Sequence, residues 1–236
     1  MKMSSNYYNI KSRCLNANLE IKNNDLAIYT FGNVSIIDRE NNVFAIKPSG
    51  VPYKNLKIND IVILNLKGEI IEGDLRPSSD TKTHLFLYNN WHQINSICHT
   101  HSTFSVSWAQ SLTSVPILGT THADHLTQNI PCTEPMEDDL IKGDYELNTG
   151  KQIVNHFKNN SIDYNEVKMC LVGSHGPFTW GTDETESVYN SVILEEICKM
   201  AFITKSINPK ISPLKTTLTD KHYQRKHGKD SYYGQK

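Results

Sequence analysis

The stretch VSIIDRENNVFAI, residues 34–46, contains two short apolar runs separated by a polar turn. Asn41 and Asn42 stand at this turn, as is typical of a tight hairpin between antiparallel strands. Further apolar runs lie outward from it, at residues 28–31, 61–66 and 69–71, and Lys67-Gly68 separates the last two. We therefore predict a meander of antiparallel strands in this part of the chain.

Helical patterns and short strands intermix in the remainder of the chain. Apolar residues at helical spacing predict helices over residues 8–21, 103–111 and 183–206, and Ser79 or Asp80 is suited to cap another that runs to about residue 91. Residues 137–157 are predicted to be helical in part, interrupted by Gly143 and Gly150. Buried strands are expected at residues 96–100 and 169–172.

These elements do not alternate regularly as βαβ units, and the sequence contains no internal repeat. We therefore predict an α/β fold of the α+β type, with three layers (α-β-α) around a central, largely antiparallel sheet. The whole chain, residues 1–236, is expected to form a single domain.

The composition argues against several classes of protein. Hydrophobic residues make up 38% of the 236 residues and charged residues 21%, which favours a packed core over a disordered chain. A formal net charge of −1 argues against binding to nucleic acid or to an anionic membrane surface. Five scattered cysteines, and the lack of an apolar run of about 18 residues, favour a cytoplasmic enzyme with reduced thiols.

The residues most typical of a metal site are His99 and His101, at the end of a predicted strand. Side chains two residues apart on a strand point to the same face, so both imidazoles can converge on one ion. His175, in the turn-like GSHGP at 173–177, is a third candidate, and three protein ligands are typical of catalytic zinc. Two other interpretations stay open: an ordinary polar pair at a strand end, and a rival ligand set at residues 122–125, HADH.

Three polar segments are suited to bind an anion without a basic surface. PSSDT at 77–81 offers hydroxyls and free backbone N–H groups if it opens a helix, and its Asp80 can reach a metal or a proton. KPSG at 47–50 offers a charge, a hydroxyl and a glycine, and Gly32-Asn33 forms a further small turn. Each segment alone is also typical of an ordinary cap or turn, but together they indicate a phosphate pocket.

The chain becomes polar and basic from Pro209 onward. This tail carries aromatic and basic side chains, namely His222, Tyr223, Arg225, His227, Tyr232 and Tyr233. A frayed, solvated end is one interpretation. Contact with RNA is another, although the near-neutral charge of the chain argues against it.

Taken in order, these segments resemble the L-ribulose-5-phosphate 4-epimerases of the class II aldolase superfamily. The resemblance spans residues 8–235 and is carried by eight separated blocks: FGNVS, IKPSGV, EGDLRPSSDTKTH, HTHS, GTTHAD, IPCT, SHGPFTWG and DKHYQRKHG…YYGQ. It implies a metal-dependent isomerase that interconverts L-ribulose 5-phosphate and D-xylulose 5-phosphate in a homotetramer. Active sites at the subunit interfaces would then receive the tail, residues 209–236, from the neighbouring chain.

The resemblance also implies roles for individual residues. The expected ligands of Zn²⁺, with Mn²⁺ or Co²⁺ as substitutes, are His99, His101 and His175, with Asp80 as a further ligand or close neighbour. Asp124 and Tyr233 correspond to an acid–base pair. The substrate and its phosphate are expected to contact Asn33, Lys47, Ser49, Gly50, Ser78, Ser79, Glu146 and His222. One departure is His125, where relatives carry an aromatic residue.

The implied chemistry is cleavage and re-formation of the C3–C4 bond, because the hydrogen on C4 is not α to the C2 carbonyl. An L-fuculose-phosphate-type aldolase is the main alternative, but such enzymes carry Glu where this chain has Asp80. A zinc-binding interaction protein without catalysis is a more remote alternative. The pathway, breakdown of L-arabinose or of ascorbate-derived pentoses, stays open at this stage.

Overall fold

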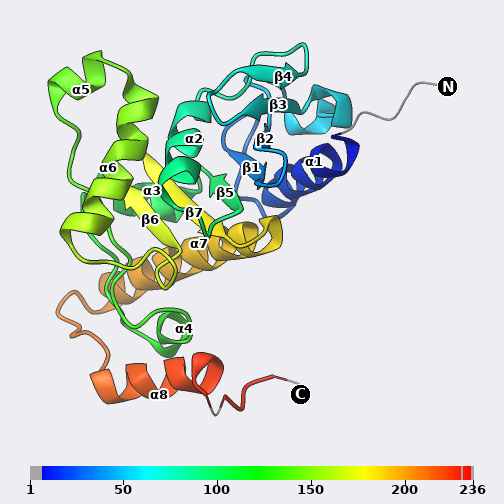
Figure 1. Ribbon diagram of the computed structural model, residues 1–236. Coiled ribbons are helices and arrows are strands. Elements are labelled where there is room, and N and C mark those ends of the chain that lie inside the picture. Colours follow the sequence, from blue (N-terminus) through cyan, green and yellow to red (C-terminus); the bar gives the residue numbers. More distant parts are fainter. Residues whose placement is uncertain (1–6, 230, 235–236) are drawn as a thin grey trace.

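A seven-stranded antiparallel sheet forms the centre of the computed structural model, which describes residues 7–229 and 231–234 (Figure 1). The strands lie in the order β4-β3-β2-β1-β5-β7-β6, so the predicted meander forms one half of the sheet. Their bounds are β1 Asn33–Asp38, β2 Val43–Ile46, β3 Val62–Asn65, β4 Ile70–Glu72, β5 Ser96–His99, β6 Met169–Val172 and β7 Gly176–Gly181. The ends of the predicted domain, residues 1–6 and 235–236, lie outside the described residues, as does residue 230.

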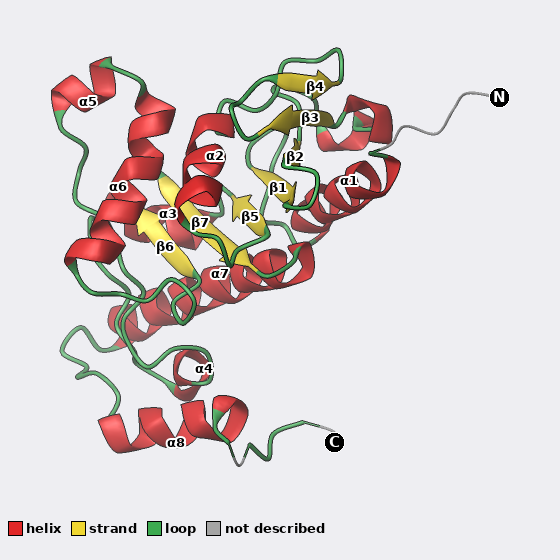
Figure 2. Ribbon diagram, viewed as in Figure 1, coloured by secondary structure: helices red, strands yellow, loops and turns green. Residues whose placement is uncertain are grey.

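Helices cover both faces of this sheet (Figure 2). The long helix α7 and helix α1 pack against one face, with α3 beside α7, while α2 and α6 pack together on the other. The predicted three-layer arrangement is therefore confirmed. The helices are α1 Tyr8–Asn23, α2 Thr81–Asn90, α3 Thr103–Gln110, α4 Thr120–Ala123, α5 Asp138–Lys142, α6 Tyr145–Asn159, α7 Glu184–Ile207 and α8 Thr216–His227, with 3-10 turns η1 Tyr53–Asn55 and η2 Ile58–Asp60.

Strand β7 shows how the alternation of side chains fills the two layers. Trp180 points toward α2 and α6, where its ring lies 4.7 Å from that of Trp91 and 5.3 Å from that of Phe157. The next side chain, Thr179, points to the opposite face and donates a hydrogen bond of 2.7 Å to the backbone carbonyl of Ser187 in α7. Successive residues therefore join the sheet to different helical layers.

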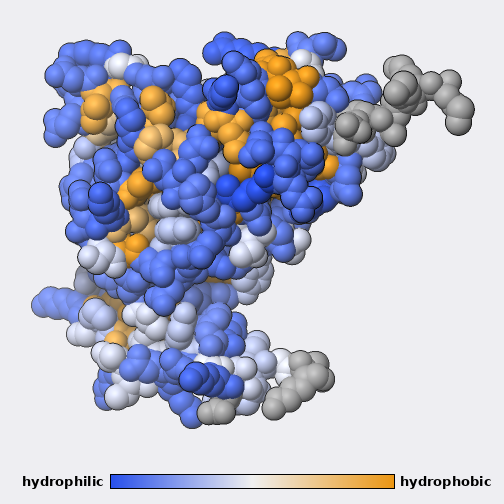
Figure 3. Space-filling model, in the orientation of Figure 1, coloured by the Kyte–Doolittle hydropathy of each residue, from blue (hydrophilic) through white to orange (hydrophobic). Residues whose placement is uncertain are grey.

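The strand predicted at residues 28–31 is wrong. These residues form a turn, in which Tyr29 has a positive φ of 52° and an 81% exposed side chain. The apolar run is therefore not a core segment. Figure 3 shows an apolar area on the surface over β4, where Ile70 and Ile71 are about half exposed.

Two glycines predicted to interrupt a helix behave differently. Gly143 ends α5, as expected, but Gly150 lies within α6. A Cβ atom at Gly150 would stand 2.9 Å from Cβ of Phe86 and 3.1 Å from the carbonyl oxygen of Thr83, both in α2. The missing side chain therefore serves the close approach of two helices rather than a break in one.

Helix capping explains the start of α7 and leaves α2 unusual. The Asp183 carboxylate accepts a hydrogen bond of 2.8 Å from the backbone N–H of Glu186 and so caps the first turn of α7. Asp80 occupies the N-cap position of α2 but makes no side-chain capping bond there. Its carboxylate is therefore available for another purpose.

All five cysteines are buried free thiols. Within the described residues, helices long and apolar enough to cross a membrane are absent.

Candidate metal centre and substrate pocket

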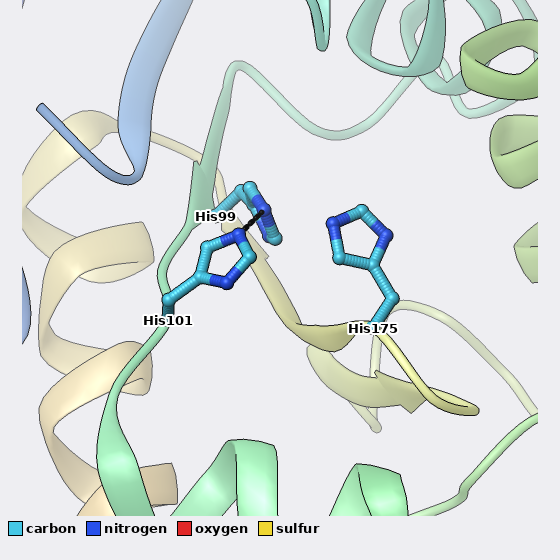
Figure 4. A group of neighbouring side chains, drawn as sticks. All are labelled: His99, His101 and His175. Carbon is cyan, nitrogen blue, oxygen red and sulfur yellow. Dashed lines mark hydrogen bonds between the residues drawn. The ribbon is translucent and has the colours of Figure 1, made fainter.

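Three imidazoles gather at the end of β5 (Figure 4). His99 is the last residue of β5, His101 follows two residues later, and His175 lies in the turn between β6 and β7. One ring nitrogen from each lies within 4.8 Å of the others, so the three can share one ion. The predicted ligand set is therefore brought together by the fold.

Pairing between β5 and β7 produces this convergence. His99 stands opposite Phe178, and the two rings stack at 4.2 Å. The turn before β7 closes with a 2.9 Å hydrogen bond from the His175 N–H to the Val172 carbonyl, and Ser174 has a φ of +62°. The predicted tight turn is confirmed, and it holds the third imidazole beside the first two.

Hydrogen bonds orient the ring nitrogens. Nδ1 of His99 lies 2.8 Å from the Pro177 carbonyl oxygen, which can only accept, so Nδ1 carries the proton and Nε2 keeps its lone pair. That Nε2 lies 3.1 Å from Nε2 of His101. The Tyr145 hydroxyl lies 3.2 Å from Nδ1 of His175, so Nε2 of that ring is the nitrogen that can bind a metal. Each ring is thus held with a nitrogen available to a metal.

The protonation state also suits a metal. Burial lowers the pKa of His175 to about 3 and that of His101 to about 4, and in each case the neighbouring imidazole of His99 acts in the same direction. Both rings are therefore neutral near pH 7, and only neutral imidazole binds a metal. Nitrogen donors in this number fit zinc, and they also accept manganese or cobalt.

Asp80 turns its carboxylate toward the same site instead of capping α2. It accepts hydrogen bonds from Nδ2 of Asn33 at 2.6 Å and from the Ser78 hydroxyl at 3.3 Å. Burial raises the pKa of Asp80, but His99, His84 and His175 together with the Asn33 amide outweigh it and hold the pKa below its usual value. Asp80 does not belong to the group of donor atoms within 4.8 Å of one another, so it is a neighbour of the three histidines.

A pocket of about 340 Å³ opens beside the histidines. Residues 47–50 and 78–80 form part of its wall. The two segments are joined by hydrogen bonds from the Ser49 N–H to the Arg76 carbonyl and from the Ser78 N–H to the Lys47 carbonyl. All the residues predicted to contact the substrate or its phosphate line this pocket, except His222. The lining includes Asn33, Lys47, Ser49, Gly50, Ser78, Ser79, Asp80, His101, Tyr145, Glu146 and His175.

Gly32 brings a further loop against this pocket. Its φ is +78°, and a Cβ atom there would stand 2.8 Å from the carbonyl oxygen of His99. Only glycine permits this approach of the 30–33 loop to the end of β5. The loop thereby places Asn33 next to Asp80.

Lys47 is the cation of the pocket, and only 2% of its surface is exposed. Its ammonium contacts the carbonyl oxygens of Thr30 at 3.3 Å and Pro48 at 3.4 Å and lies 4.9 Å from the centre of the Tyr53 ring. Burial lowers its pKa to about 8, against an opposing effect of Asp80. Among the described residues, carboxylates that form an ion pair with Lys47 are absent, so the site favours an anionic ligand.

The residues predicted from the tail gather elsewhere. Helix α8, which sequence reasoning missed because its composition is polar, packs against α4 below α7, and its surface is hydrophilic (Figures 1 and 3). Asp124, at the end of α4, accepts from Nδ1 of His222 at 2.9 Å and from Arg225 at 3.0 and 2.7 Å. Tyr233 is 61% exposed. None of these side chains lines the pocket that includes His101 and His175.

The rival ligand set at residues 122–125 is not supported. His122 is buried, and its Nε2 lies 3.2 Å from the Gln128 carbonyl, while the ring of His125 packs 5.7 Å from that of Tyr189. In the part of the chain that the structure describes, only His99, His101 and His175 form a group with metal-binding geometry.

Two residues of the site were not predicted. Tyr145 orients His175, and His84 is buried in α2, where its Nδ1 contacts the Ser35 hydroxyl at 2.7 Å. Burial lowers the pKa of His84 to about 3. The position of His84, one helical turn after Asp80, is the sequence signal that could have indicated it.

Comparison with known proteins agrees with this geometry. Residues 12–202 match the model of the Class II Aldolase and Adducin N-terminal domain. Over 227 residues the chain is 44% identical to L-ribulose-5-phosphate 4-epimerase UlaF of Salmonella paratyphi C, covering 96% of this chain and 99% of that protein. The UlaF protein of Salmonella typhi is 43% identical over the same share of both chains.

Solved structures share the fold at lower identity. An L-fuculose 1-phosphate aldolase superposes with a TM-score of 0.75 at 21% identity, over 92% of this chain and 95% of that one. The enzyme of the same name from Glaciozyma antarctica gives 0.74 at 16% identity, over 95% and 84%. At these identities the likeness concerns the fold alone.

Replacing His175 with Asn should reduce the bound divalent metal at least about tenfold, because one of three imidazole donors is lost. Elemental analysis after dialysis against buffered zinc measures this loss directly. His92→Asn is the matched control, since His92 is exposed at the end of α2. Equal metal content in both variants would remove His175 from the ligand set.

Proposed function

Because this chain belongs to the class II aldolase and adducin family, we propose that it is a metal-dependent L-ribulose-5-phosphate 4-epimerase. One observation carries this most strongly: near full-length similarity to proteins of that name coincides with a cluster of three histidines beside a pocket that a buried lysine lines. Zn²⁺ is the proposed metal, with Mn²⁺ or Co²⁺ as substitutes. The reaction belongs both to L-arabinose catabolism and to ascorbate-type pentose breakdown, and either pathway is compatible with the proposal.

The substrate dictates the reaction. A base removes the proton of the C4 hydroxyl, the C4–O electrons form an aldehyde, and the electron pair of C3–C4 passes into the enediolate of dihydroxyacetone. The second fragment, glycolaldehyde phosphate, rotates and is attacked on its other face, and an acid returns a proton to the C4 oxygen. The ion that His99, His101 and His175 would hold supplies Lewis-acid stabilisation of negative charge.

The pocket residues have separate tasks in this scheme. Lys47 neutralises the phosphate, which stays on glycolaldehyde phosphate after cleavage. Its oxygens are bound by hydroxyl and backbone donors of Ser49, Gly50, Ser78 and Ser79. Holding the phosphate keeps glycolaldehyde phosphate in the pocket while its aldehyde turns. Asn33 and Asp80 form a polar wall between this anion site and the histidines, and Glu146 also lines the pocket.

Asp124 and Tyr233 are the proposed acid–base pair, assisted by His222. We infer that they reach the pocket of a neighbouring chain in a homotetramer. This arrangement is supported by the position of α4 and α8, which pack together away from the histidines of their own chain (Figure 1). A single chain thus carries the metal half of one site and the acid–base half of another.

Metal-loaded protein should convert L-ribulose 5-phosphate into D-xylulose 5-phosphate, lose this activity on chelation and recover it when zinc is added back. A coupled assay for D-xylulose 5-phosphate measures the conversion, and an aldehyde assay in parallel detects net cleavage. Release of free aldehyde without epimerisation would identify an aldolase instead. Full metal loading without turnover of any pentulose phosphate would favour a non-catalytic zinc protein.

Lys47→Met should raise KM for L-ribulose 5-phosphate about 10- to 100-fold, since charged hydrogen bonds are worth about 1.5–3 kcal/mol. Steady-state kinetics at saturating metal give the value. Lys54→Met is the control, because Lys54 is an exposed lysine outside this pocket. An unchanged KM in Lys47→Met would move the phosphate site elsewhere.

Asp124→Asn and Tyr233→Phe should each lower kcat at least about 10²-fold, the lower range for loss of a general acid or base. Tyr232→Phe, at an equally exposed neighbouring tyrosine, should retain kcat. Near wild-type turnover in either of the first two variants would exclude that residue from proton transfer.

A further inference from the structure

One guanidinium contacts both members of the proposed acid–base pair. Nε and Nη2 of Arg225 donate to the two carboxylate oxygens of Asp124 at 3.0 and 2.7 Å, which is a bidentate ion pair. The same guanidinium carbon lies 5.0 Å from the centre of the Tyr233 ring. We propose that Arg225 is the positioning residue of this pair, holding the carboxylate and the phenol together; this rests on the proposed function above.

The backbone adds a second connection between these groups. The N–H groups of Tyr232 and Tyr233 donate to the carbonyl of Arg225 at 3.1 and 3.2 Å, so the tail folds back onto the end of α8. Arg225 therefore fixes Tyr233 through its carbonyl and its side chain at once. Lys226 also lies over the Tyr233 ring, at 4.7 Å, but among the described residues only His222 and Arg225 form ion pairs with Asp124.

The proton transfers of the proposed reaction explain why one cation contacts both members of the acid–base pair. In one direction, one member of the pair takes the C4 hydroxyl proton and the other returns a proton to the re-formed alkoxide, so their protonation states are exchanged after each turnover. The pair thus carries one negative charge, either on Asp124 or on the phenolate of Tyr233. A guanidinium stays cationic throughout and stabilises both states, which an ammonium cannot do with bidentate geometry.

Several charged or titratable groups surround the Asp124 carboxylate. From α8 come His222, Arg225, Lys226 and His227; α7 contributes Tyr189, and His125 is adjacent in sequence. Burial raises the pKa of Asp124, but the hydrogen bonds from Arg225 and His222 outweigh it and hold the pKa below its usual value. Loss of Arg225 therefore raises this pKa, and Asp124 becomes protonated at higher pH than in the wild type.

The test compares Arg225→Met, Arg225→Gln and Arg225→Lys with the control Lys221→Met, which removes a cation that lies 5.7 Å from the Tyr232 ring on the same helix. Arg225→Met and Arg225→Gln should lower kcat about 10- to 100-fold with little change in KM. In the pH profile of kcat, they should shift the acid limb to higher pH by about 1 to 3 units. Arg225→Lys should fall between them and the wild type, because it keeps the charge without the bidentate contact. Circular dichroism and metal content verify folding.

Two results would overturn the proposal. An unchanged acid limb in both uncharged variants, or a raised KM at constant kcat, would show that Arg225 does not act through Asp124. Carboxyl ¹³C NMR titration of Asp124 gives the same comparison without turnover: its pKa should rise in Arg225→Gln and not in Lys221→Met. A wild type that titrates as described but does not epimerise its substrate would refute the proposed function, and the role of Arg225 with it.

Discussion

The antiparallel pairing of β5 with β7 is the interaction on which the site depends. Its register sets His99 against Phe178 and Cys98 against Thr179, so the imidazole and its stacking partner share the α2 face of the sheet. A slip by one residue would turn His99 toward α7 and separate it from the turn that carries His175. The hydrogen bond from His99 to the Pro177 carbonyl ties ring orientation to that same register.

Beside these paired strands, the pocket contains a cation, Lys47, and a carboxylate, Asp80, that do not form an ion pair with each other. Lys47 is held by carbonyl oxygens and the Tyr53 ring, whereas Asp80 is held by Asn33 and Ser78. Burial of an ammonium without a carboxylate partner is unfavourable in the free protein. The structure is therefore prepared for a ligand that brings its own negative charge, as a sugar phosphate does.

Local sequence patterns predicted most of the fold and of the metal site, and the elements that were missed or predicted wrongly have physical explanations. The H-x-H spacing indicated the ligand pair correctly although His101 lies just beyond the end of β5, and the turn at His175 was visible in its glycines and proline. Strand β7 was missed because GPFTWG contains residues typical of turns, and the 28–31 strand was predicted wrongly because apolar residues are not always buried. Helix α8 carries too few apolar residues for its periodicity to be detected, and spacing along one chain cannot place Asp124 relative to the histidines.

A site divided between chains has a direct test: co-expression of two inactive variants, His175→Asn with an intact tail and Tyr233→Phe with an intact metal site. Random mixing in a symmetric oligomer gives about a quarter of the sites both intact halves, so turnover should recover to roughly that fraction of the wild type. Tandem tags on the two variants allow mixed oligomers to be isolated before assay. Mixed oligomers that stay inactive would contradict the division and place both halves of the site within one chain.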